Sequence, residues 1–199
     1  MRLEGAGVLL LVDRRAHAAL AADSECRLAD LGLAVLVPEL APETLEADRA
    51  ALREIERALD ELERRPGIDR ERLAAVGFGR GGTLAFLLGC ARRLAAVVDV
   101  DGPVLYPELS PARPIQPVEL ALNFEGAFLG AFAARDPSVT DEELAFLRER
   151  LEAAARPHEL VRMSGASPRA WDPARDDEAP VRDELWRRLE AFLRESLAG

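Results

Sequence analysis

The 199-residue sequence has little cysteine and histidine, no lysine, and no long apolar run. Its two cysteines, Cys26 and Cys90, are too few for a disulfide framework, so we expect buried thiols in a reducing, cytoplasmic compartment. No apolar segment approaches the length of a membrane span, and no basic leader precedes the first apolar run, so no membrane association is expected. The formal net charge of −10 disfavours a nucleic-acid partner, because such a surface would repel phosphates.

Motifs for bound metals and cofactors are missing as well. No group of His, Cys and Glu residues has metal-ligand spacing, and no glycine-rich loop matches a P-loop or a dinucleotide-binding fingerprint. We therefore expect the protein to carry neither a metal nor an organic cofactor.

Short apolar runs alternate with amphipathic stretches along the whole chain. The runs predict strands and the stretches predict helices. Such alternation is typical of a three-layer αβα sandwich, with a mostly parallel sheet of about six strands and helices on both faces. We expect one domain over residues 1–199, because the length suits a single core and no internal repeat is present. The predicted strands are 7–12, 33–37, 73–78, 94–100, 126–133 and 158–163, and the predicted helices are 18–31, 43–65, 81–92, 141–155 and 181–197.

A ligand site is expected beyond the carboxyl ends of these strands, as in other open α/β sheets. The segments to inspect are the loops after Val12, Val37, Phe78, Val100, Ala133 and Met163. One of them, the run Gly77-Phe78-Gly79-Arg80-Gly81-Gly82, joins a predicted strand to a predicted helix. That is the setting of a nucleophile elbow, a sharp turn that exposes one side chain above the sheet.

The elbow segment 75–85 resembles the G-x-C-x-G-G or G-x-S-x-G-G motif of dienelactone hydrolases, a branch of the α/β-hydrolase fold. Four further segments resemble landmarks of the same family and occur in the same order: 27–40, 129–137, 165–168 and 184–192. The first predicted strand matches the family's third strand, so the resemblance implies that an N-terminal hairpin is missing. The sheet edge left uncovered would favour a homodimer or pairing with a partner chain.

The resemblance also implies that two of the three catalytic positions are empty. Gly79 stands where the family has its Cys or Ser nucleophile, and Pro168 stands where it has its His. Only the acid position, Asp136, keeps its residue type. The loop after the first strand begins Asp13-Arg14 and lacks the family's glycine.

A lone acid cannot carry out acyl transfer, because its role in a triad is to orient and support the His. We therefore expect a non-hydrolytic member of the family with a binding or assembly role, acting with itself or with an active paralogue. The start of the helix after the elbow favours an anion such as a small carboxylate or phosphate. Candidate ligand-binding residues are Asp13, Arg14, Gly79 and Arg80, with Arg15 nearby. The alternative is that these arginines are merely solvated.

Two other functions stay open. The chain could hydrolyse esters or lactones with an unorthodox group, such as Asp136 activating water or Cys90, or it could be a purely structural domain. The serines near the matched positions have no base beside them: Ser138, Ser164 and Ser167. His17 and His158 are predicted to be surface residues, and His158 is predicted at the end of the sheet away from the elbow.

Overall fold

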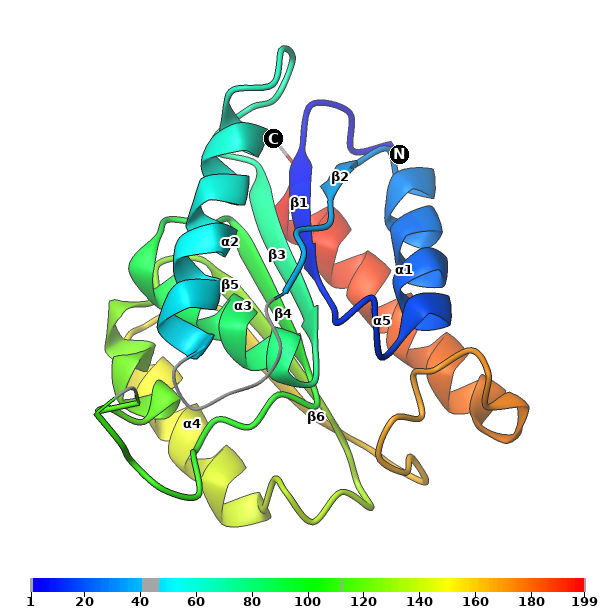
Figure 1. The fold of residues 1–199 in the computed structure, drawn as a ribbon. Helices are drawn as coiled ribbons and strands as arrows, with labels where there is room; N and C mark the ends of the chain where they lie inside the picture. The colour runs from blue at the N-terminus through cyan, green and yellow to red at the C-terminus, as the bar shows by residue number, and fades with distance from the viewer. Residues whose placement is uncertain (1, 41–46, 112, 199) are drawn as a thin grey trace.

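Six apolar runs pair side by side as one parallel sheet in the computed structural model, which describes residues 2–40, 47–111 and 113–198 (Figure 1). The order across the sheet is β2-β1-β3-β4-β5-β6. Four strands are buried along their whole length or nearly so, which explains why their sequences are continuously apolar. The strands are β1 (Gly7–Leu11), β2 (Ala34–Leu36), β3 (Leu73–Phe78), β4 (Ala96–Val100), β5 (Ala127–Ala133) and β6 (His158–Met163).

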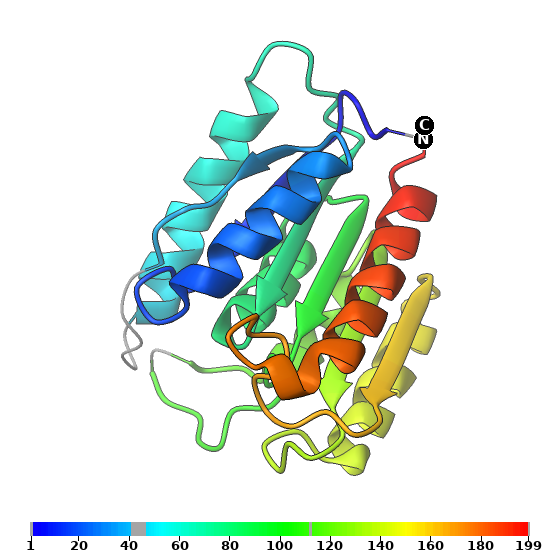
Figure 2. The ribbon, with the colours of Figure 1, turned by 90° about the vertical axis from the view of Figure 1, so that its right-hand side faces the viewer.

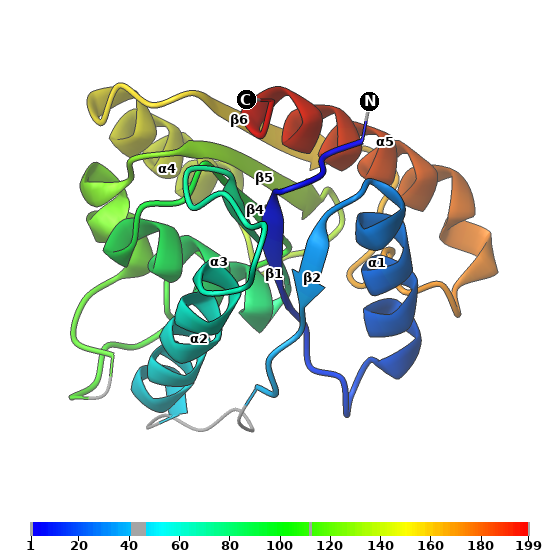
Figure 3. The ribbon, with the colours of Figure 1, turned by 90° about the horizontal axis from the view of Figure 1, so that it is seen from above.

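Five helices cover the two faces of this sheet, as predicted. Helices α1 and α5 pack on one face, and α2, α3 and α4 pack on the other (Figures 2 and 3). The observed ends differ from the predicted ones by a few residues, and the predicted start of the second helix at 43–46 lies outside the described residues. The helices are α1 (Ala18–Asp30), α2 (Ala47–Glu63), α3 (Arg80–Ala91), α4 (Asp141–Ala153) and α5 (Ala179–Ser196).

Local details of the sequence are mostly confirmed. The predicted capping box is present at the start of α4, where the Glu143 N–H donates to Thr140 Oγ1 at 3.2 Å. The irregular segment 101–125 contains one short 3₁₀ helix, Pro117–Asn123, which packs against α3 and α4. None of the helices in the described ranges is long and apolar enough to cross a membrane.

The prediction of two buried thiols is wrong for Cys26. This residue lies on the solvent-facing side of α1 and is exposed. Cys90 is partly buried near the end of α3, and its surroundings raise the pKa of its thiol to about 12. A thiol with that pKa holds very little thiolate at neutral pH, so Cys90 is a poor nucleophile.

Candidate functional site

The turn between β3 and α3 has the backbone of a nucleophile elbow without the nucleophile. Gly79 has φ +56° and ψ −128°, a conformation that side-chain-bearing residues rarely adopt. A Cβ atom added at Gly79 would meet nothing within 4 Å, whereas one at Gly77 would lie 2.0 Å from the Gly81 carbonyl oxygen. A Cβ at Gly81 would lie 1.9 Å from the carbonyl oxygen of Leu11. The turn therefore needs glycine at its flanks for close packing, and it leaves open space above Gly79.

Two cavities meet at this turn, and together we call them the elbow cleft. They have volumes of about 360 Å³ and about 440 Å³, and both are lined by Gly79, Arg80 and Asp101. The smaller cavity brings together several positions singled out from the sequence: Asp13, Gly79, Arg80, Asp136 and Pro168. The larger cavity extends over the 101–125 segment and includes Asp48, Tyr106 and Arg113.

The arginines expected to attract an anion are instead held by carboxylates of the protein. Arg80 donates to Asp48 Oδ1 through Nε at 3.1 Å and Nη2 at 3.0 Å. Arg14 does not line the described part of the cleft and pairs with Glu25 at 3.5 Å, while Arg15 pairs with Glu39. Arg80 therefore lines the cleft as expected but shares Asp48 with a second arginine, and its binding of an anion stays a prediction. Arg14 and Arg15 pair with carboxylates that sequence spacing alone does not identify.

Arg80 belongs to a buried group that we call the Asp48 cluster, formed by Asp48, Arg80, Tyr106 and Arg113. Arg113 Nε lies 2.6 Å from Asp48 Oδ2, and the Tyr106 hydroxyl donates to the same oxygen at 3.3 Å. The Arg113 guanidinium also lies over the Tyr106 ring, 4.6 Å from its centroid. The cluster joins the first turn of α2, the first residue of α3 and the 101–125 segment, so it fixes one wall of the elbow cleft.

Asp101 is the functional candidate that the sequence analysis did not single out. It follows Val100, the last residue of β4, whose carbonyl oxygen accepts the Gly79 N–H at 2.7 Å. Its φ of +56° is unusual for a residue with a side chain. The available signal was its place, because the loop after Val100 is one of the segments in which a ligand site was expected.

The Asp101 carboxylate is held by two uncharged donors. The Ala133 N–H donates to Oδ1 at 2.6 Å, and Trp171 Nε1 donates to Oδ2 at 2.5 Å. Burial raises the pKa of Asp101 to about 6, against the lowering effect of these two hydrogen bonds, and nearby Asp136 adds to the rise. A carboxyl group in such a setting changes its charge close to neutral pH, as groups that transfer protons in enzymes do.

The remaining positions matched to the family's triad also lie in the elbow cleft. Asp136 accepts the Ser138 N–H at 2.8 Å in a local turn, and Pro168 offers only its carbonyl oxygen, which Arg175 contacts at 3.3 Å. His17 also lines the cleft and is partly exposed, which agrees with its predicted surface position. Its Nδ1 lies 3.3 Å from Arg169 Nη2.

A second carboxylic acid lies beneath the cleft, on β4. Asp99 is fully buried, and its Oδ1 accepts the Gly102 N–H at 2.8 Å. Its Oδ2 has no hydrogen-bond partner among the described residues. Burial raises the pKa of Asp99 well above its usual range. A Cβ on Gly82 would lie 1.9 Å from Asp99 Oδ1, so the start of α3 packs directly onto this acid.

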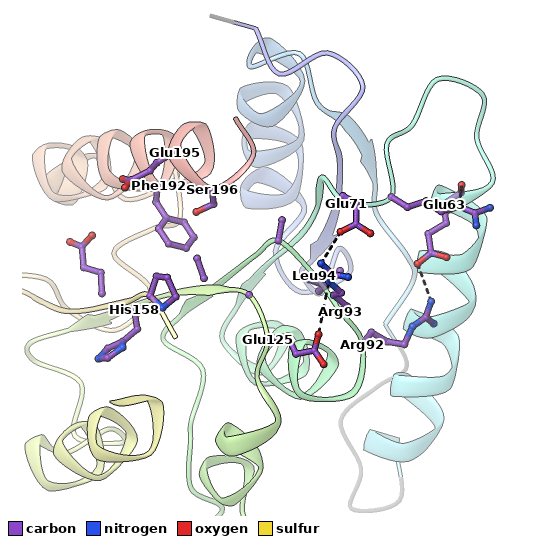
Figure 4. Close-up of a pocket in the computed structure, with 16 residues that line it drawn as sticks. Glu63, Glu71, Arg92, Arg93, Leu94, Glu125, His158, Phe192, Glu195 and Ser196 are labelled. Atoms are coloured by element: carbon purple, nitrogen blue, oxygen red, sulfur yellow. Dashed lines mark hydrogen bonds and ion pairs between the residues drawn. The ribbon is translucent and has the colours of Figure 1, made fainter. Parts of the chain in front are cut away.

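The opposite edge of the sheet holds a larger cavity of about 830 Å³ (Figure 4). Its arginines and glutamates pair with one another: Arg92 lies 3.0 Å from Glu63, and Arg93 lies 3.0 Å from Glu71. His158, at the start of β6, lines this cavity, which confirms its predicted position far from the elbow. Across the described ranges, no cluster of three or more His, Cys, Asp or Glu residues is arranged to hold a metal ion.

Comparison with known proteins gives a consistent result. The model of the dienelactone hydrolase family matches residues 41–197. A Bradyrhizobium protein named "Probable 2-oxo-3-(5-oxofuran-2-ylidene)propanoate lactonase" is 26% identical over 162 residues, which span 81% of this chain and 65% of the relative. The chain thus covers somewhat less than two thirds of that relative's length.

Solved structures show the same fold. A Klebsiella pneumoniae protein named "Putative Dienelactone Hydrolase" aligns with a TM-score of 0.80 at 23% identity, over 96% of this chain and 86% of that one. An esterase from Pyrococcus furiosus aligns with a TM-score of 0.78 at 16% identity, over 96% of this chain and 82% of that one. At these identities the likeness establishes the fold, which is that of the α/β hydrolases.

Proposed function

The chain belongs to the dienelactone hydrolase family, and from this premise we propose that it binds a small carbonyl compound in the elbow cleft without cleaving it through a covalent intermediate. The compound would be of the ester or lactone class. The single observation that carries the proposal is Gly79, which occupies the elbow conformation with no side chain and with open space above it.

At the positions matched to the family's triad, the described part of the cleft offers neither a nucleophile nor a base for acyl transfer. A covalent intermediate requires a nucleophilic side chain, and Gly79 has none. Activation of that nucleophile requires a base, and Pro168 at the matched position has no titratable group. Cys90 does not replace the nucleophile, because burial keeps its thiol protonated.

Groups that bind a carbonyl compound are nevertheless present. The Gly82 and Thr83 N–H groups donate to the Gly79 carbonyl oxygen, so the donors left for a ligand at the start of α3 are those of Arg80 and Gly81. The helix dipole favours negative charge at this end, and a carbonyl oxygen bound here would be stabilised as in an oxyanion hole. Trp171 and Leu40 supply apolar surface to the same cavity.

The test compares turnover and binding in the same protein. We expect wild-type protein to be inactive on p-nitrophenyl acetate and on a dienelactone, while a lactone raises its melting temperature. The double variant Gly79→Cys, Pro168→His restores a nucleophile and a base, so it should gain esterase activity. The matched control is Gly79→Ala, Pro168→His, which adds a Cβ without a nucleophile and should stay inactive.

The result that contradicts the proposal is esterase turnover by the wild-type protein. If that turnover were lost in Asp136→Asn, the alternative of an unorthodox hydrolase would hold, with Asp136 activating water. A wild-type protein that neither turns over nor binds any lactone would favour a purely structural domain.

A further inference from the structure

We propose that the elbow cleft catalyses proton transfer at a carbon next to a carbonyl group, with Asp101 as the base. The proposal rests on the proposed function, because the carbonyl compound must first bind above Gly79. It extends that function from binding to isomerisation, a reaction that needs a base and an oxyanion site but no nucleophile.

Asp101 lies beside Gly79 at the carboxyl end of the sheet. Phe78 and Val100 are paired in the register of the parallel strands β3 and β4. Gly79 and Asp101 are the next residues on each strand, so they stand side by side where the two chains leave the sheet. Asp101 lines both cavities of the elbow cleft, and its side chain therefore borders the open space above Gly79.

Two hydrogen bonds hold the Asp101 carboxylate in place. The Ala133 N–H and the Trp171 indole N–H each donate to one oxygen, which fixes the plane of the group. No cation pairs with Asp101 among the hydrogen bonds and ion pairs of the described residues, so its basicity is not lost to a salt bridge. Each oxygen keeps a second lone pair that can accept a proton.

The charged groups around Asp101 act in both directions. Asp136 after β5 opposes its ionisation, while Arg162 on β6 favours it. Burial and the charge of Asp101 in turn raise the pKa of Asp99 on β4. The other charged or titratable residues lining the same cavities are Asp13, His17, Asp48, Arg80, Tyr106, Arg113, Arg169 and Asp172. Burial outweighs these neighbours and leaves Asp101 able to gain and lose a proton near pH 6.

The negative charge that develops on the carbonyl oxygen also needs stabilisation. Removing a proton next to a carbonyl leaves an enolate, whose negative oxygen needs hydrogen-bond donors. The N–H groups at the start of α3 that would serve a tetrahedral intermediate can serve an enolate oxygen in the same place. Without a nucleophile at Gly79, attack on the carbonyl carbon does not compete with proton removal.

The reaction balances without a further reactant. The C–H bond breaks, its proton passes to the Asp101 carboxylate, and the electron pair of that bond moves into the carbonyl group as an enolate. The proton held by Asp101 exchanges with solvent, and Asp101 then delivers one proton to the carbon at the far end of the conjugated system. A β,γ-unsaturated lactone is thereby converted into its conjugated isomer.

The probe is α-angelica lactone, a small β,γ-unsaturated lactone, incubated with the full chain in D₂O and followed by proton NMR. We expect wild-type protein to exchange the acidic protons for deuterium and to form the conjugated lactone. Asp101→Asn should slow exchange by about 10²-fold or more, because it removes the base. The matched control, Glu71→Gln, removes a carboxyl group from the cavity at the opposite edge and should exchange at the wild-type rate.

A pH profile keeps the test decisive if Asp101→Asn folds poorly. The wild-type rate should rise with pH and level off above about pH 6, because the base must be ionised. Trp171→Phe removes one donor to the carboxylate, which raises its pKa and should move the midpoint of the profile upward.

Three outcomes would overturn the proposal: no exchange by the wild type, exchange in Asp101→Asn at the wild-type rate, or a pH-independent wild-type rate. If the wild type binds the lactone, measured by thermal shift, but does not exchange its protons, isomerisation fails and the proposed binding function stands. If the wild type opens the lactone ring to the acid, the proposed non-hydrolytic function itself fails.

Discussion

The two edges of the sheet carry cavities that differ in chemistry more than in size. At the amino-terminal edge, in the larger cavity, Arg92 and Arg93 are matched by glutamates. In the elbow cleft, Asp101 is held by uncharged donors, and both Gly79 and Asp101 have left-handed backbones. A strained backbone and a carboxylate held only by uncharged donors each lower the stability of a fold. Their presence therefore points to a functional site, which the volume of a cavity by itself does not.

The largest expected effect concerns the Asp48 cluster, an ion-pair group in the wall of the elbow cleft. Asp48→Ala removes the carboxylate that both Arg80 and Arg113 contact in a buried setting. We expect it to lower the free energy of unfolding by about 3–5 kcal/mol, since breaking a buried pair leaves charge that is poorly compensated. Urea denaturation monitored by circular dichroism measures this value. A loss of unfolding free energy below about 1 kcal/mol would mean that the Asp48 cluster contributes no more than exposed ion pairs do.

The Asp48 cluster also shows where sequence reasoning stopped. The buried strands and amphipathic helices were predictable, because a doubly covered parallel strand must be continuously apolar and a helix face repeats every three or four residues. The turn at Gly79 and the placement of Asp136 and Pro168 followed from the resemblance. The Arg80–Asp48 pair joins residues 32 apart in the chain, and no local pattern encodes it.

Asp101 was missed for a related reason. Its loop was predictable as part of a ligand-binding edge, but its importance comes from two hydrogen bonds donated by distant segments. Trp171 lies 70 residues away, and Ala133 lies 32 residues away. Only the folded chain brings these donors to one carboxylate and sets its pKa.

The next effect tests how tightly the elbow is packed. Gly81→Ala places a Cβ at 1.9 Å from a backbone oxygen of β1, so the helix or the strand must shift. We expect the free energy of unfolding, measured by thermal or chemical denaturation, to fall by about 3 kcal/mol. That value is at the upper end of the usual cost of overpacking a core. Gly79→Ala is the control: it meets no atoms and should cost only about 1 kcal/mol of backbone strain. Equal losses in the two variants would mean that close packing does not define the turn.

A smaller effect depends on pH and concerns Asp101. The folded state raises its pKa from 3.8 to about 6, so the folded protein binds this proton more tightly than the unfolded chain. Asp101 therefore contributes stability at low pH that is lost as pH rises from about 4 to about 6, on the order of 2–3 kcal/mol.

Asp101→Asn cannot titrate and should not show this part of the decline. Urea unfolding of both proteins at several pH values gives the difference between them. A difference that does not change across this pH window would show that Asp101 has an ordinary pKa.

The smallest effect belongs to the opposite edge. Glu71→Ala breaks an exposed pair with Arg93, whose side chains are 68% and 72% accessible. We expect a change of at most about 1 kcal/mol in unfolding and none in lactone binding, because water and salt screen such pairs. A loss as large as that of Asp48→Ala would remove the contrast between the two edges.

The open space above Gly79 has a consequence for the genetic history of the site. A single base change turns a glycine codon of the right type into one for serine or cysteine, and a single base change likewise turns a proline codon into one for histidine. Because the glycine keeps the elbow backbone in shape, the first of these changes would put a side chain into a ready-made position. On the proposed function, short mutational steps rather than a rebuilt fold would separate this chain from a complete triad, and selection on a new substrate would act on it directly.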